Sequence, residues 1–276
     1  MRTFLDLTRR NLIEAKWTFF ATASGLFGVG WLAVFLTLRA ERRITEAIAK
    51  GDLAQLARMA RGFGGMALDY SSASIEMNAW NLPFILLPVI VWSIGRGSIA
   101  VAGELERGTV DLILSRPVSR ASYLLAQVAA AAIGLLGLGA ALVVGHLVGT
   151  RYNTLAAPPA LIRVCLPALN LGALGLVIFG VTLVVSAVDR VRWRPNLIGS
   201  CLALASYILM IVVNQEGMEE FKSLERYSIF KAYNPVEVAT VGATFGPNVG
   251  VLLGLATGAV AIALVGFSRR DLPAGS

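Results

Sequence analysis

Residues 121–150 read "ASYLLAQVAAAAIGLLGLGAALVVGHLVGT" and contain no Asp, Glu, Lys or Arg. An α-helix rises 1.5 Å per residue, so about 20 apolar residues are enough to cross the roughly 30 Å hydrocarbon core of a bilayer. This stretch is longer than that minimum. It therefore predicts a transmembrane helix in the middle of the chain.

The rest of the chain is built in the same way. Hydrophobic residues make up 56% of its 276 residues and charged residues 15%, whereas about a quarter of a soluble domain is charged. Five further uncharged windows bring the predicted spans to six, in one all-α polytopic membrane domain covering residues 1–276. The expected spans are about 17–38, 78–99, 121–149, 164–188, 196–215 and 247–267. The second contains Pro83 and Pro88, which membrane helices tolerate when neighbouring groups satisfy the freed carbonyls.

The distribution of Lys and Arg predicts the orientation in the membrane. With the N-terminus inside, the inside segments carry 13 basic residues and the outside segments 11. The loop "DRVRWR" at 189–194 places three arginines between two spans, and such short loops follow the positive-inside rule best. We therefore expect both termini and residues 96–120 to face the cytoplasm, with the protein in the plasma (inner) membrane.

The charge and the residue types limit the function classes. A net charge of +7 needs no nucleic acid partner, because basic residues beside a membrane meet anionic lipid headgroups. His146 is the only histidine, so we expect no metal site and no catalytic cluster. The six windows hold no charged residue of the kind that ion-coupled carriers keep at depth. The chain also has no Gly-Lys dipeptide, so it lacks the phosphate-binding P-loop pattern.

Glycines recur at helical spacing near the C-terminus. Gly250, Gly254 and Gly258 follow one another every four residues, a pattern that lets two membrane helices approach closely. Further glycines lie within 121–149. Two explanations are open: dense packing inside one bundle, or an interface between subunits.

Three regions outside the spans also carry a pattern. Residues 1–16 mix apolar and basic side chains, which favours an interfacial helix leading into the first span. Residues 40–61 are amphipathic with a helix stop at Gly51, and form either a hairpin or an outward extension of the first span. Residues 216–237 mix acids with aromatic side chains, which is typical of a short interfacial or re-entrant helix.

A short polar segment, "GELERGTVDLILSRPVSR" at 103–120, separates spans two and three. Thr109 is expected to cap a new helix whose first turn holds Asp111 beside the positive end of the helix dipole. The helix should end at Arg116, because Pro117 disfavours helical geometry in the residue before it. Ser119 is expected to cap the next helix. The result is a short transverse helix on the membrane surface, offered to a cytosolic partner; the alternative is a merely solvated turn.

The same segment resembles the signature of ABC-2 type transporter permeases. In that family a Gly-Glu pair, a further acid, Gly-Thr, a leucine-rich turn and Pro-x-Ser-Arg follow in this order between spans two and three. The matching residues here are Gly103-Glu104, Glu106, Gly108-Thr109, 112–114 and 117–120. Two features depart from the family pattern: Gln127 stands where many relatives have lysine, and the first outer loop is long.

The resemblance implies a non-catalytic permease subunit, and two such chains, identical or different, would form the pore. Separate ABC-type ATPase subunits would bind ATP and Mg, while this chain would hold no cofactor, and export is the usual direction in the family. A short coupling helix would receive the motion of the ATPase, and the residues implied in that coupling are Gly103, Glu104, Glu106, Arg107, Gly108, Thr109, Asp111, Leu112, Arg116, Pro117, Ser119 and Arg120. The other function classes left open are an ATP-independent secondary carrier and an intramembrane enzyme. The sequence does not indicate the substrate.

Overall fold

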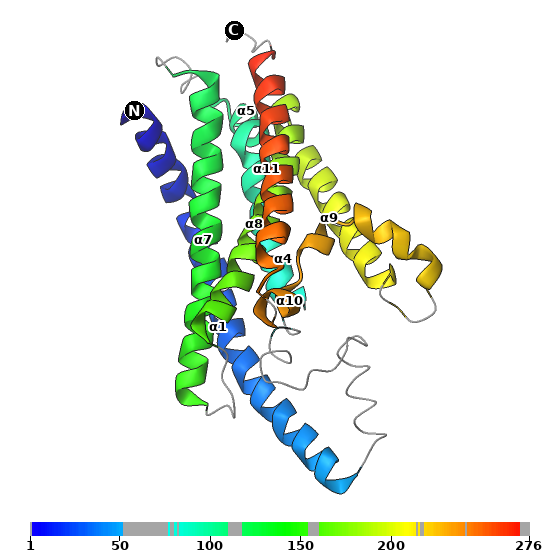
Figure 1. Cartoon of the computed structure of the whole chain (residues 1–276). Coiled ribbons are helices and arrows are strands. Elements are labelled where there is room, and N and C mark those ends of the chain that lie inside the picture. The colour runs from blue at the N-terminus through cyan, green and yellow to red at the C-terminus, as the bar shows by residue number, and fades with distance from the viewer. Residues whose placement is uncertain are drawn as a thin grey trace.

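The computed structural model describes residues 2–51, 77, 80–81, 83–109, 118–153, 160–213, 215, 218–240 and 242–270. Every regular element in these ranges is helical, and six helical stretches are long and apolar enough to cross a membrane. The predicted all-α fold with six spans is therefore confirmed. Figure 1 shows the long helices gathered into a bundle, with α9 diverging from it toward one end.

The six long stretches follow the uncharged windows of the sequence. The second is composite: α4 continues without a break through the π-helical turn η1 and the short helix α5. The elements are α1 (Arg2–Lys50), α4 (Pro83–Ser98), η1 (Ile99–Gly103), α5 (Glu104–Glu106), α7 (Arg120–Tyr152), α8 (Leu161–Val188), α9 (Trp193–Val213) and α11 (Phe245–Ser268).

Helix α1 extends beyond the first predicted span at both ends. Residues 2–16, expected as an interfacial helix, form the first turns of the same helix. At the other end α1 continues to Lys50, so the extension of span one is observed up to this point. Gly51, with φ +64°, ends it, because the left-handed conformation costs glycine little. Residues 52–61, the rest of the amphipathic stretch, lie outside the described residues.

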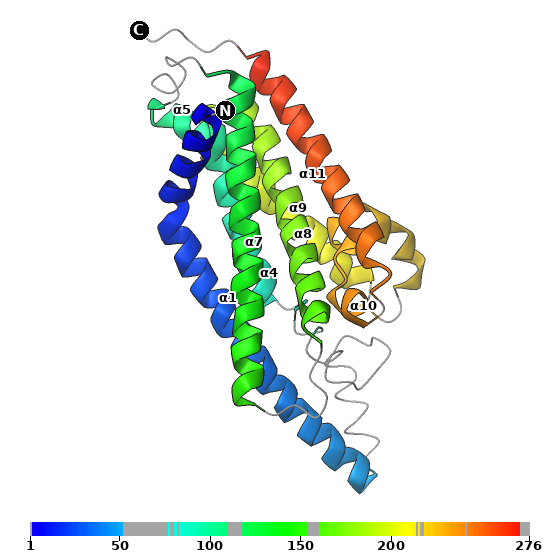
Figure 2. The same cartoon turned by 60° about the vertical axis from the view of Figure 1, so that its left-hand side comes forward.

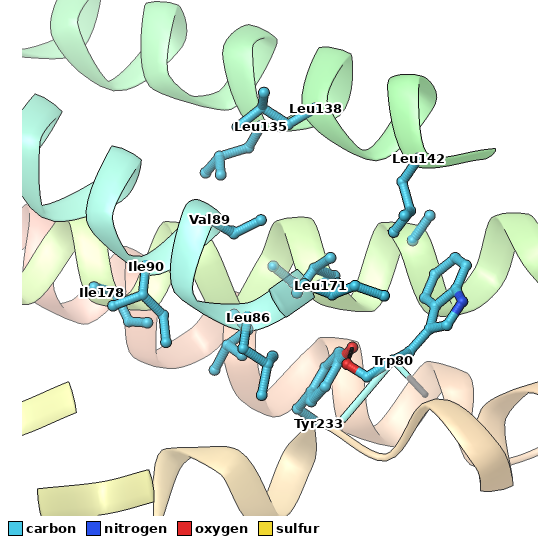
Figure 3. Close-up of a cluster of buried hydrophobic side chains, with 14 of the residues drawn as sticks. Trp80, Leu86, Val89, Ile90, Leu135, Leu138, Leu142, Leu171, Ile178 and Tyr233 are labelled. Atoms are coloured by element: carbon cyan, nitrogen blue, oxygen red, sulfur yellow. Dashed lines mark hydrogen bonds between the residues drawn. The ribbon is translucent and has the colours of Figure 1, made fainter. Parts of the chain in front are cut away.

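Helix α8 lies at the centre of the bundle and contacts α4, α7, α9 and α11. Figure 3 shows part of the larger core, in which Leu86, Val89 and Ile90 of α4 lie near Leu171 and Ile178 of α8. Burial of such side chains contributes about 1.5–3 kcal/mol each in water, but inside a bilayer close packing matters more, because lipid tails are equally apolar.

The polar region before the last span folds back onto this core. It contains two 3₁₀ helices, η2 (Glu219–Tyr227) and η3 (Ile229–Ala232), and the short helix α10 (Pro235–Thr240). Phe221 and Tyr227 are exposed, whereas Phe230 and Tyr233 are buried. The Tyr233 hydroxyl donates to the Trp80 carbonyl at 3.1 Å, the dashed line in Figure 3. The aromatic residues therefore divide between the surface and the core.

Glycine allows α1 and α7 to pack closely. A Cβ atom built at Gly30 would overlap the Leu142 carbonyl, and one built at Gly145 would overlap the Phe27 carbonyl. The C-terminal glycines behave differently: nothing described lies within 4 Å of a Cβ built at residues 250, 254 or 258. Helix α11 buries the opposite face, with Leu252, Ala256, Ala259, Ala263 and Phe267. Dense packing inside one bundle thus holds for the glycines of α7 and not for Gly250, Gly254 and Gly258 of α11.

Both described ends of the chain lie at the same end of the bundle. Figures 1 and 2 show the N-terminus, α5 and the C-terminal end of α11 together there. This arrangement agrees with an even number of spans. That this end faces the cytoplasm stays a prediction.

Candidate functional site

The polar segment after the second span begins with a buried carboxylate. Glu104 is only 2% exposed although it lies at the end of its helix. One carboxylate oxygen accepts from Arg107 Nη2 at 3.0 Å, and the other accepts from the Thr109 hydroxyl. Arg10 Nη2 of α1 lies 3.5 Å from the same carboxylate. Glu104 therefore joins the start of the chain to both ends of the turn that follows α5.

A side-chain hydrogen bond and a glycine in the left-handed conformation close that turn. Arg107 Nε donates to the Gly103 carbonyl at 3.1 Å, and Gly108 adopts φ +68°, a conformation that favours glycine. The Thr109 hydroxyl lies against the carboxylate and the carbonyl of Glu104. Thr109 was expected as a helix cap, and the residues that it would cap lie outside the described residues. Residues 103–109 thus form a fixed turn supported by its own side chains.

The second acid links the turn to the loop between α8 and α9. Glu106 accepts a hydrogen bond from the Arg192 backbone N–H at 2.9 Å. Within that loop, desolvation raises the pKa of Asp189. The Val191 and Arg190 backbone N–H groups and the Arg194 guanidinium outweigh this effect, so the pKa lies below its usual range. A carboxylate therefore orders the loop that Glu106 contacts.

The far end of the polar segment is anchored as well. Ser119 caps α7, accepting from the Ser122 N–H at 3.1 Å, as predicted. Arg120 Nη1 donates to the carbonyls of Ser268 at 3.1 Å and Arg270 at 2.6 Å, and Arg270 Nη1 donates to the Asp189 carbonyl at 2.8 Å. Cations at helix C-termini satisfy free carbonyls and oppose the helix dipole. Both ends of the segment are consequently tied to the same loop.

A buried polar layer lies beneath this turn, and sequence reasoning missed it. Arg96 of α4 is 7% exposed, and its Nη2 atom lies 3.4 Å from both the Asn11 carbonyl and Gln127 Oε1. Gln127 Nε2 in turn donates to the Tyr123 hydroxyl at 3.4 Å. The uncharged window in the sequence stopped before Arg96, but α4 continues past this residue, and α1 and α7 enclose its side chain. Gln127, the departure from the family pattern, is the one available clue.

The predicted coupling residues fall into three groups. Gly103, Glu104, Arg107, Gly108 and Thr109 come together around one carboxylate. Glu106 contacts the loop between α8 and α9, Ser119 caps α7, and Arg120 contacts the C-terminal end of α11. Asp111, Leu112, Arg116 and Pro117 lie outside the described residues, so the expected transverse helix is untested.

The arrangement is suited to mechanical linkage. It joins α1, α5, α7 and the C-terminal ends of α8 and α11 at one end of the bundle through hydrogen bonds and ion pairs. Among the described residues, no three His, Cys, Asp or Glu side chains lie together in a group that could hold a metal. His146 is buried within α7, away from this cluster along the chain.

Comparison with known protein families finds a match over most of the chain. The model of the family described as ABC-2 family transporter protein matches residues 43–272. No curated protein and no solved structure matches the chain significantly. The match begins in the extension of α1, after the predicted first span, and covers the other five spans with the whole polar segment between the second and third. The chain therefore belongs to the ABC-2 family of transporter proteins.

Proposed function

We propose that this ABC transporter permease exports its substrate with energy from ATP hydrolysed in a separate ABC-type ATPase subunit. The observation that carries the proposal is the buried Glu104 carboxylate, which holds residues 103–109 against α1 through Arg10. A push on this turn from a docked partner would therefore be transmitted to two membrane helices instead of being absorbed by a loose loop.

The partner follows from family membership and from the missing P-loop. Two permease chains, identical or different, would form the pathway, and two ATPase subunits would bind ATP and Mg at the end that holds α5. Closure of the ATPase dimer would displace residues 103–120. The links through Glu106 and Arg120 would carry the displacement to the ends of α8 and α11.

The experiment begins with the tagged permease, solubilised from its native membrane in mild detergent. We expect an ATPase subunit with a P-loop to purify with it. The reconstituted complex should hydrolyse ATP faster than the ATPase alone, and replacing the P-loop lysine of the ATPase should abolish both hydrolysis and transport. Transport by the permease alone would contradict the proposal and favour an ATP-independent carrier.

A further inference from the structure

The second span leaves α-helical geometry immediately before the turn formed by residues 103–109, which we call the coupling turn. Residues Ile99–Gly103 form a π-helical turn between α4 and α5. A π turn contains one more residue than an α turn and interrupts the regular hydrogen-bond ladder, so it persists where other groups satisfy the backbone. Such turns occur often at functional sites.

A serine of α8 forms hydrogen bonds with the backbone of this turn. Ser186 Oγ accepts from the backbone N–H groups of Val101 at 3.3 Å and Ala102 at 2.9 Å. Its hydroxyl donates to the Ser98 carbonyl at 3.1 Å. A serine hydroxyl offers one proton and two lone pairs, and here all three are used on one turn of a neighbouring helix. Ser186 has no measurable exposure.

A second side chain holds the same turn from α7. The Tyr123 hydroxyl donates to the Ala100 carbonyl at 2.7 Å, and the side chain is 2% exposed. Close packing brings Ser186 within reach: a Cβ built at Gly97 would lie 2.8 Å from the Phe179 carbonyl and from Thr182 Cβ. Side chains from two different helices, α7 and α8, thus form hydrogen bonds with the π turn.

We propose that Ser186 and Tyr123 are positioning residues that hold this π turn and thereby aim Glu104 at Arg10; the inference rests on the proposed coupling function. Each residue of an α-helix turns the chain by about 100°. If the π turn relaxed to α geometry, the extra residue would be lost from the turn. Glu104 and Glu106 would then rotate by about that angle away from Arg10 and the Arg192 N–H. The turn sets the register between α4 and the coupling segment.

The first measurement needs no ATPase. Hydrogen exchange is followed on the full-length permease in lipid nanodiscs, with fragmentation that resolves the amides of Val101 and Ala102. Ser186→Ala should accelerate exchange at both amides by at least about tenfold. Ser186→Thr, which keeps the hydroxyl, should remain close to wild type. Ser93→Ala is the matched control, because Ser93 is also buried and its hydroxyl has no hydrogen-bond partner among the described residues.

The second measurement is ATP hydrolysis by the co-purified ATPase, reconstituted with each permease variant. Coupling between sites typically corresponds to a factor of 5–150, so Ser186→Ala should lower permease-stimulated hydrolysis by at least about fivefold. Ser186→Thr and Ser93→Ala should retain it. If Ser186→Ala does not insert into the membrane, Tyr123→Phe replaces it, with the same two effects expected.

The outcomes separate the inference from the function on which it rests. Unchanged exchange or unchanged stimulation in Ser186→Ala overturns the inference, as does a Ser186→Thr variant impaired as severely as Ser186→Ala, because the effect then comes from packing. A wild-type permease that stimulates no ATPase removes the proposed function, and the coupling role of Ser186 with it. The wild-type sample by itself shows whether the proposed function has failed, before any variant is compared with it.

Discussion

Replacing Glu104 with glutamine tests the centre of the proposed coupling site. Glutamine keeps the size of the side chain and removes its charge. The carboxylate is buried and contacts Arg107 at 3.0 Å, Arg10 at 3.5 Å and the Thr109 hydroxyl. We therefore expect the variant to insert into the membrane, to unfold more easily than wild type, and to couple poorly to the ATPase.

The size of the effect follows from the exposure of the two arginine partners. Hydrogen bonds to charged groups contribute about 1.5–3 kcal/mol each. The Arg10 and Arg107 side chains are 39% and 55% exposed, so water recovers much of that energy when the charge is removed. A net loss of about 1–2 kcal/mol remains, which is a factor of about 5–30 in the folded-to-unfolded ratio.

The assay is reversible denaturant unfolding in detergent, run beside ATPase stimulation. Glu225→Gln is the matched control: Glu225 pairs with Lys231 at 3.7 Å in the region before the last span, with Lys231 52% exposed, and it should change stability by less than about 0.5 kcal/mol. The double change Arg10→Gln with Glu104→Gln should be less costly than the sum of the single changes. Wild-type unfolding and wild-type stimulation in Glu104→Gln would refute the role assigned to this carboxylate.

Three further outcomes are expected. The Asp189 pKa is depressed in the folded state, so its contribution to stability is present above about pH 4, the ordinary aspartate value. That contribution should disappear as the pH falls through the folded pKa. Asp189→Asn should remove this part of the pH dependence of the unfolding free energy. The same pH dependence in Asp189→Asn as in wild type would contradict the prediction. Gly145→Leu should sharply lower thermal stability, whereas Gly254→Leu should leave the isolated chain stable and change only oligomer size, measured by light scattering. A Ser119→Cys substitution in a variant without the native cysteines should react with an impermeant thiol reagent in inverted vesicles; labelling from outside intact cells would reverse the predicted orientation.

Much of the fold was predictable because membrane insertion depends on composition. Any apolar stretch of sufficient length must satisfy its backbone groups internally, and a helix does so without partners. The uncharged windows therefore predicted six spans, and Gly51 and Ser119 predicted a helix end and a helix cap, since these signals are local. The ordered residues of segment 103–120 likewise predicted the family, because the match depends on residue order and not on contacts.

The contacts inside the site were not predictable in this way. Nothing local distinguishes Ser186 from other small polar residues of a span, yet its hydroxyl supports a π turn that begins 87 positions earlier in the sequence. Arg96 marked the edge of an apolar window and is instead enclosed by α1 and α7. The evenly spaced glycines of α11 look like a packing motif but face away from the bundle. The apolar lengths of the chain determined that it forms six membrane helices; which faces of those helices meet was decided only by the tertiary structure, because side-chain hydrogen bonds and close backbone contacts join residues that are far apart in the sequence.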